Sequence, residues 1–466
     1  MVYIPQLYGV CEGPTFIFYI TLKRTLLLFS FVTHFGSDTA FNDRINQLAW
    51  IGIKSDIICE PWWTWTENLS YFKAIKYLLN APVEFIEYPN ELFDYPGVSA
   101  SQCISDYTNF YNTYKGDTAT ASIPLFGPSF SNNVTGPGAF LNSGGYDMTD
   151  KMDYGNLHCY PGGMYVEGPQ GGGNGVSLDA DINEYHLINQ GNKPLAATET
   201  GYQLPFDNQW GVTDSVAAKY EPRVLMWYLK KGIKYTYRYQ LINDTNDLSG
   251  PANNYGILDS DCSRRLSFYA IKNTIKLFSD PGQPFTPGTL NYTLSGDTAG
   301  VNLQSMLFQK RNGIFLLVLW QAISSGTCNA GPEDFNNPPI SVKVSISGTA
   351  GGTALGYTPS FDSNSVASFT GIDSMTINVS DHIYVLEIKP TFADGSMNIY
   401  PNPGSGFITI STQDNINSIA ICNLIGQTSY SCKCNSPTVQ VDVADLPAGM
   451  YLVKVNGSEV KKFIKE

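Results

Sequence analysis

The pattern of hydrophobic and polar positions changes character along the chain. From residue 31 to about residue 280, short apolar runs that suit buried strands alternate with longer runs of helical periodicity. The predicted strands are residues 31–35, 52–58, 83–91, 122–130, 154–161, 193–202 and 233–242. The predicted helices are residues 38–52, 66–80, 102–115, 178–191, 215–232 and 263–278. Such alternation predicts parallel strands covered by helices.

Most of these strands end in polar or carboxylate side chains, as in a (β/α)8 TIM-type barrel, where the chemistry lies at the carboxyl ends of the strands. Seven strands are predicted where a closed barrel has about eight. Only 24 residues separate strand 52–58 from strand 83–91, whereas a stretch holding a further strand needs about 50, since one βαβ unit takes roughly 30. We therefore expect one βα unit to be missing or shortened in a barrel spanning residues 31–282.

Beyond residue 283 the helical periodicity stops, and short alternating strands separated by Gly, Ser, Asn and Pro take its place. This pattern predicts an antiparallel β-sandwich over residues 283–390, including a hairpin that turns at Asn312-Gly313. A short polar linker (391–397) leads to a second all-β unit, residues 398–466. The predicted fold class is thus α/β plus all-β.

The first 30 residues are irregular and resemble the remnant of an export signal. Residues 21–30 are basic and then apolar, but no small-x-small cleavage site follows them. Lys23 and Arg24 interrupt the apolar run 16–32, and a membrane-spanning helix needs about 20 apolar residues. We therefore predict no integral membrane span.

The composition favours an extracellular protein that handles uncharged ligands such as sugars. Only 15% of the residues are charged, while the chain has 29 Tyr and 25 Phe. A net charge of −13 without a Lys/Arg-rich run argues against nucleic acid as a partner. The nine cysteines are scattered, so we expect mostly reduced, buried thiols rather than a disulfide scaffold or a zinc knuckle.

The strongest candidate chemistry is a pair of carboxylates at the ends of two predicted strands. Glu91 lies in the segment EYPNE, directly after Asn90, and Glu199 lies in ATETGY. Hydrolysis of a glycosidic bond with retention needs two carboxyl groups about 5 Å apart, one as acid/base and one as nucleophile. The alternative is that both residues are ordinary surface acids.

If the missing unit is counted, Glu91 ends the fourth strand and Glu199 ends the seventh. An Asn-Glu pair after the fourth strand and a lone Glu after the seventh resemble the large clan of retaining (β/α)8 glycoside hydrolases, which includes cellulases, xylanases, mannanases and β-glycosidases. Four segments look like one bacterial branch of it: EYPNE, YGNLHCYPGG, KPLAATETGY and GIKYTYRYQLI. The resemblance implies Glu91 as acid/base, Glu199 as nucleophile and Asn90 as a ligand of the substrate 2-hydroxyl. No cofactor and no metal are implied.

Several other residues are candidates for supporting the reaction or binding substrate. His158 and Tyr160 lie at the end of strand 154–161, the sixth if the missing unit is counted, and the resemblance implies that Tyr160 bonds the nucleophile. Tyr202 follows Glu199 in the same segment. Tyr237 and Tyr239 alternate on the last strand, so we expect one of them to face the barrel mouth.

His34 ends the first strand and would either bond a sugar hydroxyl or serve as a capping residue. Trp62 and Trp63, in the segment PWWTWTEN, would either stack on sugar rings or pack around a shortened loop. Glu87, on the same strand face as Glu91 but deeper, is interpreted as a buried structural acid. The clan usually has an Arg near the end of the second strand, where this chain reads Lys-Ser-Asp at residues 54–56.

The C-terminal unit resembles the type IX secretion sorting domain of Bacteroidetes-type bacteria. The resemblance rests on YPNP (400–403), then SIAICNLIGQ, DVADLPAGMYLVKV and a final basic KKFIKE. It implies the type IX secretion machinery as a partner and a secreted or outer-membrane surface-attached protein.

We therefore predict a secreted retaining hydrolase of β-linked polysaccharide or oligosaccharide. The principal alternative is a catalytically inactive surface carbohydrate-binding protein on a degenerate barrel. A structural or adhesive surface protein is a third possibility, and it predicts that Glu91 and Glu199 do not converge.

Overall fold

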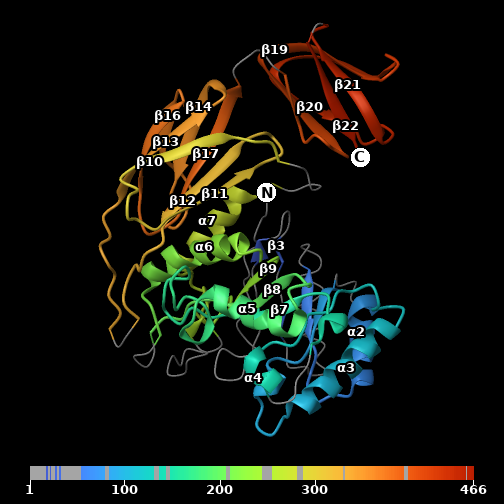
Figure 1. The fold of residues 1–466 in the computed structure, drawn as a ribbon, viewed down its shortest axis with the longest axis vertical. Coiled ribbons are helices and arrows are strands. Elements are labelled where there is room, and N and C mark those ends of the chain that lie inside the picture. The colour runs from blue at the N-terminus through green and yellow to red at the C-terminus, as the bar shows by residue number, and fades with distance from the viewer. Residues whose placement is uncertain are drawn as a thin grey trace. The chain divides into compact units, whose positions relative to one another are not determined.

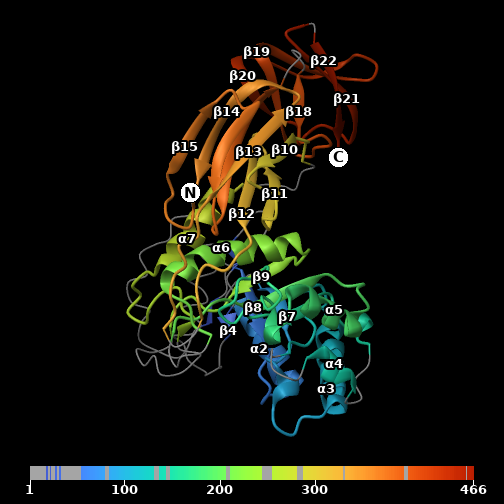
Figure 2. The ribbon, with the colours of Figure 1, turned by 60° about the vertical axis from the view of Figure 1, so that its left-hand side comes forward.

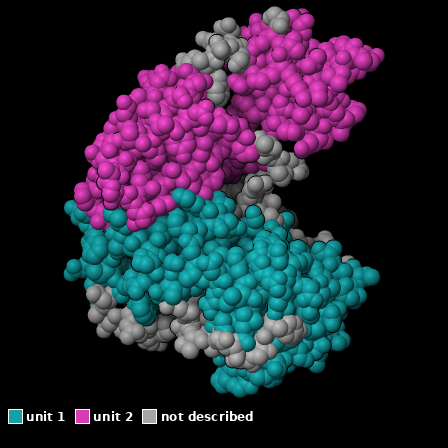
Figure 3. Space-filling model, viewed as in Figure 1, with its two compact units in different colours: residues 1–272, 323–336 teal, residues 273–322, 337–466 magenta. Residues whose placement is uncertain are grey.

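The computed structural model describes most of the chain. The described ranges are residues 54–78, 83–130, 136–142, 147–205, 210–243, 254–280, 287–328, 331–392, 397–457 and 459–466, with four two-residue strands before residue 33. The described chain forms two compact units (Figure 3). Unit 1 comprises residues 1–272 and 323–336, and unit 2 comprises residues 273–322 and 337–466. His34 and the predicted helix 38–52 lie outside the described residues.

Unit 1 is built on parallel strands. One sheet holds β4 (Phe31–Val32), β5 (Ser55–Ile58) and β6 (Val83–Glu87), and another holds β7 (Gly155–His158), β8 (Leu195–Thr200) and β9 (Tyr235–Arg238). Short strands β1 (Ile17–Phe18), β2 (Thr21–Leu22) and β3 (Leu27–Leu28) precede them. β1 pairs antiparallel with β4, and β2 pairs antiparallel with β3.

The predicted strand 122–130 joins these two parallel sheets through single bridges rather than as a full strand. Leu125 pairs with Ile86 of β6, and Phe126 pairs with Tyr154 beside β7, both in parallel. The strand order therefore follows the chain from β4 to β9, with the bridging segment in the middle. The result is a near-barrel of parallel strands, in agreement with the predicted alternation of strands and helices.

The helices of unit 1 lie outside these strands (Figures 1 and 2). They are α2 (Trp65–Leu78), α3 (Ala100–Gly116), α4 (Pro137–Asn142), α5 (Leu178–Asn189), α6 (Asp214–Lys230) and the start of α7 (Leu266–Phe278), with short 3-10 turns η1 (Leu92–Asp94), η2 (Thr149–Lys151) and η3 (Gly173–Gly175). Thr64 and Glu67 form a capping box at the start of α2, since each side chain accepts a hydrogen bond from the backbone N–H of the other.

Aromatic side chains fill the interior of the near-barrel. Phe85 of β6, Phe126 of the bridging segment, Ala196 of β8 and Tyr237 of β9 form one buried cluster. The rings of Phe85 and Phe126 stack with centroids 4.8 Å apart. The interior is thus a packed core, as in barrel enzymes, and any site must lie at the strand ends.

Residues 323–336 belong to unit 1, although the sequence pattern assigns them to the predicted sandwich. The segment is held by α6: Arg223 donates to the Ile323 carbonyl at 3.0 Å, and the Tyr220 hydroxyl accepts from Ser325 N–H at 2.7 Å. Arg223 is fully buried and forms an ion pair with buried Glu167. Removing either partner of such a buried pair would leave an unpaired charge in the interior, so both residues are needed.

Unit 2 contains two antiparallel sheets that share one apolar core. The smaller sheet has the order β10 (Asn291–Gly296), β13 (Ile340–Ser347), β16 (Ser374–Val379). The larger has the order β11 (Leu303–Gln309), β12 (Phe315–Gln321), β17 (Tyr384–Phe392), β14 (Thr349–Tyr357), β15 (Ser365–Thr370). Side chains of both sheets, such as Leu317 and Val344, meet in this core. The predicted hairpin joins β11 to β12, with Gly313 at φ 82°.

The C-terminal strands of unit 2 form a further antiparallel sheet with a core of its own. Its strands are β18 (Asn398–Tyr400), β19 (Phe407–Asn423), β20 (Thr428–Asp442), β21 (Gly449–Val455) and β22 (Glu459–Lys465). Ile408, Ile421, Val453 and Phe463 are fully buried there. This confirms that an all-β region follows residue 398.

Eight of the nine cysteines lie in the described residues, and all eight are free thiols. Three of them, Cys59, Cys103 and Cys159, are buried, while the other five are partly exposed. None of the helices in the described part of the chain has the length and apolar character needed to cross a membrane.

Candidate active site

Glu91 lies four residues beyond the end of β6, in a sharp turn. Its backbone has φ 46° and ψ 38°, in the left-handed region that side-chain-bearing residues rarely adopt. The backbone N–H of Glu91 donates to Ser129 Oγ at 3.1 Å, and its carbonyl accepts from Asp94 N–H at 2.9 Å. These two bonds fix the turn and set the direction in which the Glu91 carboxylate points. A strained turn held by its surroundings is typical of functional positions.

Glu199 lies near the end of β8 and is 8% exposed. The Tyr160 hydroxyl, two residues beyond β7, donates to Glu199 Oε2 at 2.6 Å. The rings of Tyr239 and Tyr255 contact the ring of Tyr160 at centroid distances of 6.1 and 5.3 Å. Burial, together with the negative charge of Glu199, raises the pKa of Tyr255 to about 12. Three tyrosines therefore surround the Glu199 side of the site.

His158, the last residue of β7, lies between the two carboxylates. Its Nδ1 is 2.8 Å from Glu91 Oε1 and 3.7 Å from Glu199 Oε2, and its ring is fully buried. Burial alone lowers the pKa of His158, but the charge of Glu199 and the hydrogen bonds to Glu87 and Glu91 outweigh burial and raise the pKa well above its ordinary value. The surrounding carboxylates therefore favour the cationic form of the imidazole, which balances part of their negative charge.

A second layer of polar side chains lies beneath His158. Glu87 Oε1 accepts hydrogen bonds from Asn156 Nδ2 at 2.6 Å and from Thr198 Oγ1 at 3.0 Å. The Thr198 hydroxyl also contacts His158 Nε2 at 3.0 Å. Glu87 is 1% exposed, which matches its interpretation as a buried structural acid. The network orients the His158 ring, and through it the Glu91 carboxylate.

The two acids converge. One oxygen of Glu91, one oxygen of Glu199 and a ring nitrogen of His158 all lie within 4.8 Å of one another. Two carboxylates at about 5–5.5 Å have the spacing used for retaining glycoside hydrolysis. The same three atoms would also suit a divalent cation, although Tyr160 and His158 already occupy one oxygen of each carboxylate with hydrogen bonds.

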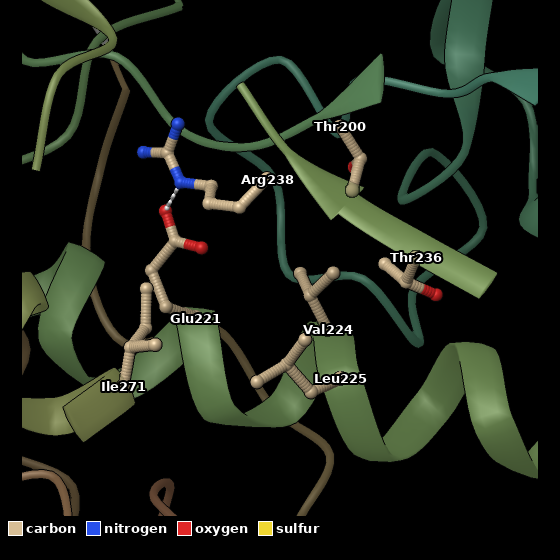
Figure 4. Close-up of a pocket in the computed structure, with 7 residues that line it drawn as sticks. All are labelled: Thr200, Glu221, Val224, Leu225, Thr236, Arg238 and Ile271. Carbon is tan, nitrogen blue, oxygen red and sulfur yellow. Dashed lines mark ion pairs between the residues drawn. The ribbon is translucent and has the colours of Figure 1, made fainter. Parts of the chain in front are cut away.

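The back of β8 is held by a buried ion pair (Figure 4). Arg238 of β9 reaches Glu221 of α6, with Nε 2.7 Å from Oε1, and its Nη2 donates to the Tyr202 carbonyl at 2.8 Å. A Cβ at Gly201 would lie 2.5 Å from Arg238 Nη1 and 2.6 Å from the Tyr239 carbonyl, so only glycine fits directly after Thr200. This close packing fixes the end of the strand that carries Glu199.

The remaining predicted site residues occupy different environments. Asn90 lies at the turn before Glu91, and its Oδ1 is buried without a hydrogen-bond partner among the described residues. Tyr237, on β9, is 1% exposed in the barrel core, whereas Tyr239, one residue beyond β9, contacts Tyr160. Tyr202 is 2% exposed and donates to the Met164 carbonyl at 2.8 Å.

The two tryptophans after β5 differ sharply. Trp62 is 76% exposed, and its ring stacks beside that of Tyr95 with centroids 6.1 Å apart. Trp63 packs edge-on against Tyr71 of α2, at 5.7 Å. Trp62 thus presents a ring to solvent close to the turn that holds Glu91. Trp63 instead packs against α2, which is the second of the two alternatives given for these tryptophans.

Four residues of the site were missed from the sequence: Ser129, Asn156, Thr198 and Tyr255. Asn156 and Thr198 lie on predicted strands. A small polar side chain on a buried strand was the available signal for both. Ser129 and Tyr255 lie in loops, where no periodicity indicates the direction of a side chain.

Comparison with known families identifies the C-terminal part of the chain. Residues 398–466 match the family model described as the secretion system C-terminal sorting domain. These residues are a type IX sorting domain. This sorting domain marks proteins that are secreted and often attached to the outer surface of the cell, in agreement with the predicted location. The prediction from YPNP, the central strands and the basic end is confirmed.

Several solved structures align with large parts of the chain. A glucosidase from Croceicoccus marinus aligns with a TM-score of 0.51 and 12% identity, over 75% of this chain and 81% of that one. A family 39 glycoside hydrolase from Bacteroides cellulosilyticus aligns with a TM-score of 0.44 and 16% identity, over 78% and 75% of the two chains. A bacterial orthologue of human α-L-iduronidase aligns with a TM-score of 0.45 and 10% identity, over 96% and 98%. No curated protein sequence matches the chain. The likeness to the glucosidase shows a shared fold.

Proposed function

We propose that the protein is a secreted retaining glycoside hydrolase that cleaves β-linked polysaccharide or oligosaccharide by double displacement. The convergence of Glu91 and Glu199, with oxygens within 4.8 Å, carries this proposal. The shared fold with a glucosidase supports it. We also infer the finer domain layout: a (β/α)8-type barrel with one unit missing or shortened, a β-sandwich, a linker and the sorting domain.

In this scheme Glu199 is the nucleophile. The hydrogen bond from Tyr160 stabilises its ionised form, which is the form that attacks the anomeric carbon. As that carbon–oxygen bond forms, the glycosidic bond breaks, and Glu91 gives its proton to the departing oxygen. Glu91 then takes a proton from a water molecule whose oxygen attacks the anomeric carbon. The bond from that carbon to Glu199 breaks, which releases the sugar and restores both groups. The oxocarbenium-like charge of the transition state lies next to two carboxylates, which stabilise it.

The supporting residues have distinct parts in this scheme. His158 contacts Glu91 through Oε1, so that Oε2 is the oxygen that exchanges the proton with substrate. Asn90 Oδ1, buried and without a described partner, would accept the hydrogen bond of the substrate 2-hydroxyl. Tyr239 and Tyr255 would form the wall behind the sugar that Glu199 attacks.

The test is sugar release from a panel of β-glucans, xylans, mannans and galactans by the full chain, beside Glu199→Gln and Glu91→Gln. We expect turnover on one polymer class and a loss of about 10³-fold or more in each variant, because each removes a group that acts in the transition state. Proton NMR of the first product should show the retained anomer.

Two results would count against the proposal. A well-folded chain that binds a glycan without releasing sugar would support the carbohydrate-binding alternative. Turnover that Glu199→Gln retains but a chelator abolishes would point instead to a metal held by Glu91, His158 and Glu199.

A further inference from the structure

A groove beside Glu91 has no part in the chemistry described so far. It has a volume of about 590 Å³, within the range of about 300–1,000 Å³ typical of small-molecule sites. Its lining includes the rings of Trp62 and Tyr95 and polar residues of α3. Leu92, the residue after Glu91, also lines it.

The aromatic part of the lining is rigid and open. Trp62 is 76% exposed, and its ring inclines 28° to that of Tyr95. Buried Asn68 of α2 anchors the loop before Trp62, because its side chain accepts from Glu60 N–H at 2.9 Å and donates to the Glu60 carbonyl at 3.0 Å. A fixed aromatic ring that faces solvent in a groove is a platform for the apolar face of a sugar ring.

Helix α3 supplies hydrogen-bonding groups in a row along the groove. Gln102, Ser105, Asp106 and Asn109 line the groove from one face of α3, since their spacing is i, i+3, i+4 and i+7. Asp106 is held in place by hydrogen bonds from Trp65 Nε1 at 3.1 Å and from the Tyr88 hydroxyl at 3.0 Å. A sugar ring has an apolar face and an edge of hydroxyl groups. The aromatic rings of the groove suit the first, and its amide, hydroxyl and carboxylate groups suit the second.

The position of the groove decides which sugar it would hold. The chain runs from Glu91 through η1 directly to Tyr95, and the charge of Glu91 contributes, after burial, to the raised pKa of Tyr95. In the proposed reaction Glu91 protonates the departing oxygen, so the sugar on its side of the scissile bond is the leaving one. We propose that this groove is the subsite for the leaving sugar of the substrate, and that this sugar is neutral.

The neutral character follows from the charges that line the groove. None of the ten described residues around it is Lys, Arg or His, and Asp106 is acidic. A uronic acid or a sulfated sugar would bring an uncompensated negative charge next to Asp106. The inference rests on the proposed glycosidase function and adds that the enzyme acts on glycans with at least one neutral sugar beyond the cleaved bond.

The test uses Trp62→Ala in the full chain with two substrates that share the same donor sugar. One is the β-linked oligosaccharide that the wild-type protein cleaves, and the other is the corresponding β-glycosyl fluoride, which leaves no sugar in the groove. We expect kcat/KM for the oligosaccharide to fall about tenfold or more, since a stacking platform is lost. The value for the fluoride should change by less than about twofold, because its leaving group never reaches Trp62.

Matched variants separate binding from folding. Trp62→Tyr keeps a ring and should restore most of the oligosaccharide activity, whereas Trp227→Ala, on α6, should leave both substrates unaffected. Asp106→Asn should raise turnover of a substrate whose leaving sugar is a uronic acid, relative to the neutral one.

Each outcome has one meaning. Equal loss on both substrates would give Trp62 a structural role, and no loss on either would also overturn the subsite. Faster cleavage of uronic-acid leaving groups by the wild-type protein would overturn the neutral-sugar assignment. If the wild-type protein cleaves neither the oligosaccharide nor the fluoride, the proposed glycosidase function itself fails.

Discussion

Replacing Tyr160 with Phe removes a single hydroxyl from the site and leaves its ring packed against Tyr239 and Tyr255. The lost hydrogen bond is the one donated to Glu199 at 2.6 Å. A bond to a charged group contributes about 1.5–3 kcal/mol, so we expect kcat/KM to fall by roughly 10- to 100-fold. Steady-state kinetics on the cleaved glycan would measure this loss.

The matched control is Tyr185→Phe. The Tyr185 hydroxyl is also buried but donates to the Pro128 carbonyl at 2.8 Å rather than to either acid. It should therefore lower stability by about 1 kcal/mol with little change in kcat/KM. Equal activity losses in both variants would show that Tyr160 acts through packing rather than through Glu199.

Single residues also mark how far the sequence could predict the site. Glu91, Glu199, His158 and Tyr160 stand at strand ends, where the fold class dictates convergence, and the structure brings all four together. Tyr237 and Tyr239 show what the sequence could not decide. Their alternation on the predicted last strand did not tell which of them faces the mouth and which fills the core. Ser129 and Tyr255 depend on loop paths that sequence periodicity does not encode.

At the scale of secondary structure, helix α5 carries a group that makes its packing pH-sensitive. Asp181, in the first turn of α5, accepts a hydrogen bond from Gly173 N–H. Burial raises the pKa of Asp181 to about 6, against an ordinary value of 3.8, although the bonds to Gly173 and Cys159 oppose that rise. The folded state therefore holds this proton more tightly than the unfolded state.

The sign of the effect follows from linkage. The protonated Asp181 contributes stability that is complete below pH about 4 and is lost as the pH rises through about 6. The loss is on the order of 3 kcal/mol, from a shift of about 2 pKa units. We expect Asp181→Asn to remove this loss, so that the difference in urea midpoint between variant and wild type grows from pH 4 to pH 7. A difference that stays constant over that range would contradict the raised pKa.

Elements also differ in how readily the sequence reveals them. The predicted helices in the described residues match α2, α3, α5, α6 and α7 to within a few residues, because their apolar periodicity is long. Strand β14, with Gly351 and Gly352, is hard to recognise from sequence, since glycine lacks the side-chain alternation that marks a strand. The segment 122–130 contributes only single bridges, which Leu125 makes with Ile86 and Phe126 makes with Tyr154.

At the scale of the whole molecule, the sequence indicated a change from α/β to all-β character but not the assignment of residues 323–336. These residues lie between two strands of the sandwich in sequence, yet they pack with unit 1. The reason is the pairing of groups that are far apart in sequence. Buried Arg223 on α6 needs the Ile323 carbonyl as an acceptor in addition to Glu167, and such pairing leaves no periodic signal in the sequence.

The sorting domain has a core of its own, and we expect it to direct secretion without the rest of the chain. The buried cluster around Ile408, Val453 and Phe463 draws only on residues from 397 onwards. Residues 391–466, fused to a periplasmic reporter in a bacterium with a type IX secretion system, should therefore carry that reporter outside the cell. Phe463→Asp places a charge in the fully buried core and should abolish export, because burying an unpaired charge costs several kcal/mol.

The control is Gln440→Ala, at an exposed position of β20, which should be exported normally. Immunoblots of cells and medium would separate these outcomes, and a reporter that remains periplasmic with the unaltered domain would show that export needs the preceding units as well.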